Sequence, residues 1–138
     1  MPIRFFTEEI NFNLKEKKKH RNWLTDFVKE EGFIIGEINY VFCSDEYLHK
    51  INIAYLGHDT YTDIITFDQS DSSEEISGDI FVSIERVIEN AKQNKTGFEE
   101  ELRRVIAHGI LHLMGYKDKS SQDVEQMRKK ENNALQKY

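Results

Sequence analysis

Two histidines one helical turn apart carry the most specific chemical signal in the chain. His108 and His112 lie in the stretch 105–119, which reads as the end of a helix. Four residues rise about 6 Å along a helix and bring both imidazoles to one face, where they can bind one divalent metal ion. Gly115 lets the chain reverse, and Asp118 follows closely enough to fold back toward the pair. We therefore predict a metal site made of His108, His112 and Asp118.

The same spacing also suits two histidines that merely cover a surface or fill a pocket. Ile106, Ile110 and Leu113 mark the core side of the helix, while the helix stop returns an acid toward the histidines, which favours the metal site. Zinc metalloproteases of the His-Glu-x-x-His type carry a general base directly after the first histidine. Here that position is Gly109, so peptide hydrolysis by that route would need a base from elsewhere.

The elements that must position this site alternate between helices and strands. Helical spacing and caps predict helices over 15–31, from Ser44 to about Tyr55, after Ser83, from a capping box at 96–99 to Met114, and from Ser120 or Ser121 onward. Alternating or β-branched runs predict strands over 3–6, 11–13, 34–43, 63–67 and 79–82. This pattern predicts an α/β (α+β) fold, a single domain over 1–138 whose mixed central sheet of about four strands is flanked by helices.

Composition excludes several classes of protein. The chain has 138 residues, 12% of them aromatic, which suits one domain with a compact core. No apolar run is long enough to span a membrane, and the start, MPIRFFTEEI, lacks the pattern of a secretory signal. The single cysteine, Cys43, excludes an internal disulfide framework and fits a reducing compartment such as the cytoplasm. The net charge of -6 weighs against nucleic-acid binding, although the basic run 15–21 could track an RNA backbone or be a solvated helix face.

The segment 108–116, His-Gly-Ile-Leu-His-Leu-Met-Gly-Tyr, resembles the signature of the YbeY family of metal-dependent endoribonucleases. Residues 62–67 and 78–80 resemble the Thr-Asp-Val-Leu-Ser-Phe and Gly-Asp-Ile strands of that family, and the resemblance covers about 48–135. It implies one α/β domain, one Zn²⁺ or similar divalent ion per chain, a cytoplasmic location and single-stranded RNA as substrate. It also implies ribosomal RNA and ribosome-associated proteins as partners; the oligomeric state has no signal.

The chain departs from the family pattern at two positions. The family usually has a third histidine where Asp118 stands; a carboxylate still binds Zn²⁺ and can widen the metal choice toward Mn²⁺ or Fe²⁺. The family also has an arginine, thought to serve the chemistry, where Leu56 stands here. Leucine cannot bind a phosphate, so another residue must supply that charge if the chain is a nuclease.

Two residues are candidates for this catalytic role. Arg104 precedes His108 by one helical turn and could pair with a phosphate beside the metal, or form a salt bridge with Glu100 or Glu101. His58 lies in the loop before the strand 63–67, where it could act as a general acid or phosphate donor, or be an ordinary loop histidine. His20 has no partner at ligand spacing and is expected at the surface.

The leading hypothesis is a metal-dependent, single-strand-specific endoribonuclease that acts in ribosomal RNA maturation and ribosome quality control. The main alternative is a non-catalytic ribosome-assembly factor whose metal only joins the last two helices. A weaker alternative is a hydrolase or oxygenase acting on a small molecule, because two histidines and one carboxylate also hold non-haem Fe(II).

Overall fold

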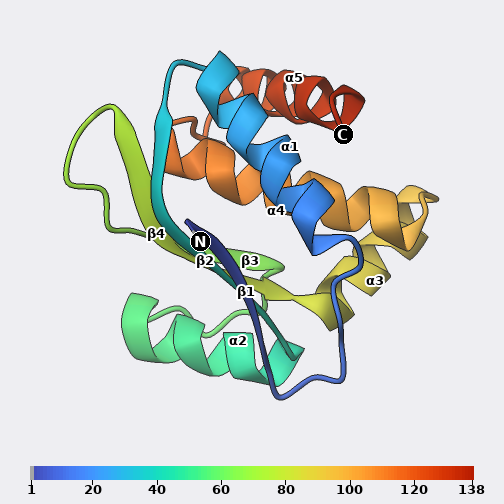
Figure 1. Ribbon diagram of the computed structural model, residues 1–138. Helices are drawn as coiled ribbons and strands as arrows, with labels where there is room; N and C mark the ends of the chain where they lie inside the picture. The colour runs from blue at the N-terminus through green and yellow to red at the C-terminus, as the bar shows by residue number, and fades with distance from the viewer. Residues whose placement is uncertain (1) are drawn as a thin grey trace.

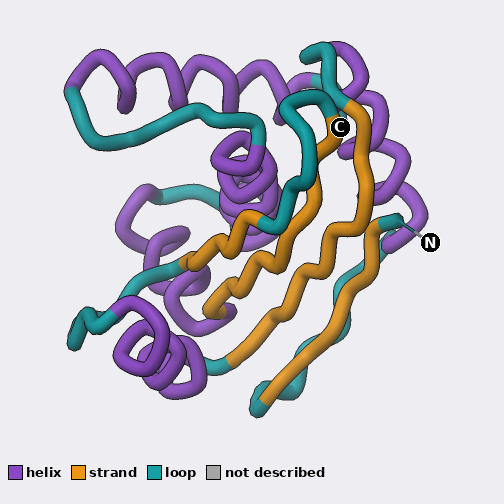
Figure 2. Tube along the Cα trace, turned by 90° about the vertical axis from the view of Figure 1, so that its left-hand side faces the viewer, coloured by secondary structure: helices purple, strands orange, loops and turns teal. Residues whose placement is uncertain are grey.

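Four strands form one mixed sheet in the computed structural model, which describes residues 2–138. The strands are β1 (Ile3–Glu8), β2 (Ile34–Cys43), β3 (Ile64–Asp68) and β4 (Glu75–Ser83), in the order β1-β2-β4-β3. β1, β2 and β4 run parallel, and β3 pairs with β4 in the antiparallel sense. In Figure 2 the strands lie side by side, and β1 forms one outer edge.

Five α-helices cover the two faces of the sheet. They are α1 (Lys17–Glu30), α2 (Asp45–Ile51), α3 (Ile84–Asn94), α4 (Phe98–Leu113) and α5 (Ser121–Gln136), and a π-helical turn, η1 (Asn52–Leu56), continues α2. Figure 1 shows α1, α4 and α5 on one side of the sheet and α2 on the other. The predicted fold class, a helix-flanked mixed sheet of about four strands, is confirmed. None of these helices, within residues 2–138, is long and apolar enough to cross a membrane.

The main core lies between the sheet and α4, the helix that carries the histidine pair. Tyr40 of β2 is fully buried and donates its hydroxyl to the Ile106 carbonyl of α4 at 2.8 Å. Gly109 allows the close approach, because a Cβ at this position would lie 2.8 Å from Ile80 Cγ2 and 3.0 Å from Ile64 Cδ1. Any larger residue at 109 would force α4 away from β3 and β4, and would move the histidines on either side of it.

Some predicted element boundaries are wrong, each for a local reason. Residues 11–13 form no strand. The capping box at 96–99 is absent, because the N-cap of α4 is Gly97, which has no side chain to cap the helix. The Thr96 N–H instead donates to Ala91 O at 3.0 Å and closes α3. β4 begins at Glu75 rather than at 79, since its first residues pair with Ile34 and Ile35 of β2.

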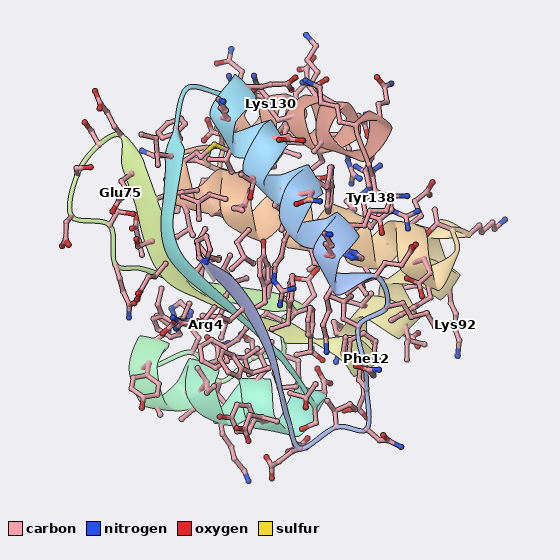
Figure 3. The ribbon with its side chains drawn as sticks, in the orientation of Figure 1. Arg4, Phe12, Glu75, Lys92, Lys130 and Tyr138 are labelled. Atoms are coloured by element: carbon pink, nitrogen blue, oxygen red, sulfur yellow. The ribbon has the colours of Figure 1, made fainter. Side chains whose placement is uncertain are left out.

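The expectation that His20 lies at the surface is also wrong. Its side chain is 1% exposed on α1, in an aromatic cluster with Phe5, Trp23 and Tyr138. Figure 3 labels Tyr138 at the end of the chain, beside α1. The basic run therefore contains one residue that faces the core, although its lysines are exposed.

Candidate metal centre

The end of α4 turns the chain back on itself and returns Asp118 to the histidine pair. Gly115 has φ 100°, a left-handed conformation that glycine adopts without steric cost. Its N–H donates to His112 O at 3.0 Å, and the Tyr116 N–H donates to Leu111 O at 3.1 Å. These two bonds form a Schellman motif, which satisfies the last carbonyls of the helix. The prediction that Gly115 ends the helix and lets the chain reverse is thus confirmed.

The three predicted ligands converge on one point. His108 Nε2 and His112 Nε2 lie 2.9 Å apart, and Asp118 Oδ2 lies 3.3 Å from the first and 3.2 Å from the second. The ligand atoms of all three residues lie within 4.8 Å of one another. Two imidazole nitrogens that present lone pairs at this distance repel unless a proton or a cation lies between them. Two nitrogens and one carboxylate oxygen are a donor set that Zn²⁺ accepts, and three protein ligands leave a position for water or substrate.

A buried carboxylate holds the other side of the His108 ring. Glu131 of α5 is 5% exposed, and its Oε2 lies 2.6 Å from His108 Nδ1. Arg104 NH1 donates to the second oxygen of Glu131 at 3.0 Å, and Arg104 NH2 donates to Asn132 Oδ1 at 2.9 Å. A chain of charged contacts therefore runs from Arg104 through Glu131 to His108.

Electrostatics distinguish the two histidines. Burial opposes protonation of His108, but the hydrogen bond and charge of Glu131, with the charge of Asp118, outweigh it and raise the pKa of His108. Burial and the neighbouring His108 lower the pKa of His112. Burial acts to raise the pKa of Glu131, yet its contacts with His108 and Arg104 lower it overall. Glu131 therefore stays an anion although its side chain is buried.

A polar groove of about 380 Å³ opens beside the cluster, between α3, α4 and α5. Its walls are mostly charged and amide side chains: Asp63, Asn90, Gln93, Asn94, Glu101, Arg104, Val105, His108, Asp118, Arg128 and Glu131. The Arg128 side chain is 59% exposed, and its NH1 lies 3.6 Å from Glu131 Oε1. A polyanion that enters this groove would meet two guanidinium groups next to the candidate metal ligands.

The structure brings one of the two predicted catalytic residues to this groove. Arg104 lines it, but pairs with Glu131 and Asn132 rather than with the predicted Glu100 or Glu101. His58 is exposed in the loop after η1, where its backbone N–H donates to Asn52 O at 3.2 Å. Neither His58 nor Leu56 is among the described residues that line the groove.

Glu131 and Arg128 were missed from the sequence, although Glu131 leaves a signal. Met127 and Ala134 are the buried apolar residues of α5, and Glu131 lies between them on the same face. A carboxylate at a core position of an amphipathic helix needs a partner, because an unpaired buried charge is costly. That pattern predicts a buried ion pair, but not the residue that completes it.

Comparison with known proteins places the chain among endoribonucleases. A family profile described as Endoribonuclease YbeY matches residues 3–138. The Flavobacterium johnsoniae protein described as Endoribonuclease YbeY is 56% identical over 130 residues, which cover 94% of this chain and 93% of that protein. The Cytophaga hutchinsonii protein of the same description is 50% identical over 133 residues, 96% of this chain and 93% of the relative.

A solved structure resembles the fold over nearly the whole chain. The solution structure of a Thermotoga maritima protein superposes with a TM-score of 0.64 at 30% identity, covering 98% of this chain and 87% of that one. The likeness therefore extends to the elements that hold the candidate metal centre.

Proposed function

The chain belongs to the YbeY family of endoribonucleases, and from that premise we propose that it is a metal-dependent, single-strand-specific endoribonuclease acting in ribosomal RNA maturation and ribosome quality control. One observation carries the metal dependence: His108 Nε2, His112 Nε2 and Asp118 Oδ2 converge beside a polar groove that His108 and Asp118 line. We propose that the whole chain, 1–138, acts as one metallohydrolase domain; Met1 lies outside the described residues.

We propose Zn²⁺ as the ion, one per chain, held by His108, His112 and Asp118. When bound, such an ion polarises a phosphoryl oxygen or lowers the pKa of a bound water. The histidines supply neutral nitrogen ligands at fixed positions on α4. Asp118, whose side chain is 43% exposed, supplies a negative charge and can adjust to ions other than Zn²⁺, such as Mn²⁺ or Fe²⁺.

The chain's own cations would position the phosphate. Arg104 and Arg128 both line the groove, and an arginine fork matches two oxygens of one phosphate. Arg104 is already engaged at both terminal nitrogens, so a catalytic role would require it to exchange the Asn132 contact for a phosphate. Arg128 is freer, because most of its side chain is exposed to solvent. The two together supply positive charge in the groove that Leu56, which stands in place of the family arginine, cannot supply.

His58 stays a predicted general acid or phosphate donor. Its support is its exposure and its place in the chain, two residues after Leu56. A substrate strand that extends from the groove over the loop after η1 could reach it. Replacement of His58 by Gln should then lower the cleavage rate without a change in metal content.

A cytoplasmic location and ribosome-associated protein partners also belong to this proposal. The single cysteine is buried and free, as suits a reducing compartment. An RNA strand as substrate follows from the endoribonuclease family, and two arginines among the lining residues of the groove are available to its phosphates. The basic run on α1 is a second candidate contact for the RNA backbone.

RNA cleavage by four preparations tests the proposal. The preparations are metal-loaded protein, chelator-treated protein, metal-loaded His108→Ala, and His49→Ala as the matched control. His49 is also a half-buried histidine, but it stacks on Tyr61 and bonds Asp59 rather than joining the cluster. We expect cleavage of single-stranded ribosomal RNA by the first and last alone. Equal, background-level cleavage by wild type and His108→Ala would instead favour the non-catalytic assembly factor.

A further inference from the structure

We propose that Glu131 and Arg104 are positioning residues for the metal centre: Glu131 fixes the ring and tautomer of His108, and Arg104 holds the Glu131 carboxylate in place. The inference rests on the proposed metal site, not on the reaction that the site performs. It gives Arg104 a role that can be measured separately from the phosphate contact considered above.

The first step is the geometry of the imidazole. A neutral histidine carries its proton on one ring nitrogen and a lone pair on the other. The Glu131 carboxylate lies 2.6 Å from Nδ1 of His108, so the proton of the neutral ring resides on Nδ1, and this N–H donates a hydrogen bond to Glu131. The lone pair is then on Nε2, the atom that faces His112 Nε2 and Asp118 Oδ2. Glu131 thus prepares His108 as a ligand before any ion arrives.

The second step is the rigidity of Glu131. It belongs to the buried face of α5, between Met127 and Ala134, and two contacts hold α5 to α1 and to the residue that caps the end of α1. The Trp23 indole of α1 donates to the Ala134 carbonyl at 2.8 Å, and Lys130 forms an ion pair with Glu31 at 3.0 Å. A side chain anchored in this way holds the His108 ring at one angle, which a mobile surface acid could not do.

The third step is the placement of the Glu131 carboxylate. A buried carboxylate needs a charged partner close by, because an unpaired buried charge is costly. Arg104 NH1 lies 3.0 Å from Oε1, and its own side chain is only 19% exposed. Arg128 adds a weaker contact at 3.6 Å from an exposed position. Arg104 is therefore the closer guanidinium, and it fixes the Glu131 carboxylate where Oε2 faces His108 Nδ1.

A purely structural bridge between α4 and α5 is the competing explanation, and a second buried acid provides the control. Glu101 of α4 is 6% exposed, lines the same groove, and accepts from Asn94 Nδ2 at 3.5 Å. Within residues 2–138, Glu101 forms no hydrogen bond or ion pair with His108 or His112. If burial alone matters, Glu131 and Glu101 variants should behave alike.

Zinc affinity measured by competition with a chromogenic chelator tests the proposal in the full chain. We expect Glu131→Ala to weaken Zn²⁺ binding by about 10- to 100-fold. Glu131→Gln should lose less, because its amide oxygen still accepts the Nδ1 proton, and Glu101→Gln should match wild type. Circular dichroism confirms that each variant is folded. Equal affinities for all four proteins, or an equal loss in Glu101→Gln, would overturn the assignment.

Nitrogen-15 NMR of the metal-free protein in alkaline buffer gives a readout that needs neither metal nor RNA. We expect the neutral His108 of wild type to carry its proton on Nδ1, and to shift to the Nε2-protonated form in Glu131→Ala. A wild-type His108 protonated on Nε2 contradicts the proposal. Because this result does not depend on cleavage, a failure here is distinct from a failure of the proposed nuclease function.

Arg104 is tested by separating metal affinity from substrate affinity. If Arg104 acts through Glu131, Arg104→Gln weakens Zn²⁺ binding, and saturating Zn²⁺ restores most of the cleavage. If it binds the phosphate instead, Zn²⁺ affinity stays at the wild-type value while KM for RNA rises. The second result would remove Arg104 from the proposed positioning role.

Discussion

Two helical histidines, the half-buried His108 at the metal centre and the buried His20 in the aromatic cluster, show how their surroundings decide what an imidazole does. Both have Nδ1 held by an acceptor: Glu131 Oε2 at 2.6 Å for His108 and the Glu16 carbonyl at 3.0 Å for His20. Nε2 of His108 faces His112 and Asp118. Nε2 of His20 is buried and has no hydrogen-bond partner among the described residues.

The acceptor at Nδ1 and the surroundings of Nε2 together distinguish a metal-binding histidine from a core histidine. A carboxylate at Nδ1 raises the basicity of the ring and so strengthens Nε2 as a metal ligand. A backbone carbonyl orients the ring without adding a charge, and the aromatic neighbours supply no second ligand for a metal ion. Burial lowers the pKa of His20, whereas the charges around His108 raise its pKa. A position inside a helix alone would not distinguish the two.

Removal of a ligand should have the largest effect on this contrast. We expect His112→Ala to lose both stoichiometric metal and RNA cleavage, because only two ligands remain. His20→Ala should retain both, but unfold with a free energy lower by about 2–3 kcal/mol, since it leaves a cavity in the aromatic cluster. Elemental analysis of the purified proteins and urea denaturation measure the two effects. Metal retained at full stoichiometry in His112→Ala would break the comparison.

A change beneath the metal centre should be the next largest. Gly109→Ala would place a Cβ 2.8 Å from Ile80 Cγ2, so we expect a loss of about 1–3 kcal/mol of stability and weaker metal binding as α4 shifts. The control is Gly97→Ala on the same helix, where a Cβ meets nothing within 4 Å. It should cost less than about 1 kcal/mol as an N-cap change and leave the metal bound. A stable, metal-binding Gly109→Ala would contradict the packing argument.

A pH series should show His20 as a core residue. Burial and the charge of Arg103 lower the pKa of His20, and contacts with Glu16 and the charge of Glu99 oppose part of this shift. The Lys19 and Arg103 cations lie over the ring of Tyr138. The unfolded chain then binds the proton more readily than the folded one. Stability is therefore lost as pH falls below the ordinary pKa of 6.5.

The variant His20→Phe removes that proton-binding group while keeping an aromatic ring. In chelator, the free energy of unfolding of wild type minus that of His20→Phe should decrease from neutral to acidic pH. Groups common to both proteins, including His108, cancel in this difference. A difference that stays constant with pH would show that His20 titrates normally despite its burial.

Replacement of the exposed ligand should have the smallest effect on stability and should sharpen the metal preference. Asp118→His restores a third imidazole, so we expect the ratio of Zn²⁺ to Mn²⁺ affinity to rise, because nitrogen ligands favour Zn²⁺. Stability should stay within about 0.5 kcal/mol of wild type at this partly exposed position. Competition titrations with both ions measure the ratio, and an unchanged or lower ratio would argue against Asp118 as a ligand.

The sequence predicts local parts of the site better than distant ones. His108, His112 and Asp118 share one segment, and helical periodicity with a glycine stop is enough to bring them together. Glu131 belongs to another helix, and its contact with His108 depends on how α4 and α5 pack, which periodicity does not reveal. The sequence does carry a signal for His20, because the apolar stripe of Trp23, Leu24 and Phe27 extends back to it at helical spacing.

The same distinction applies to the fold. The number and type of the main elements follow from apolar patterns that each element carries itself, as in β4, where Ile80 and Val82 are fully buried. Boundaries failed where a neighbouring element competes for the same groups, as at Thr96, whose N–H ends α3 and is not available to begin α4. The closeness of α4 to the sheet at Gly109 likewise needs both partners in view.

Anomalous diffraction at the zinc absorption edge, from crystals of the zinc-loaded protein, tests the central claim most directly. The account predicts one peak within about 2.0–2.2 Å of His108 Nε2, His112 Nε2 and an Asp118 oxygen, with Glu131 still bonded to His108 Nδ1. A peak elsewhere, or His108 binding through Nδ1 with Glu131 turned away, would contradict it.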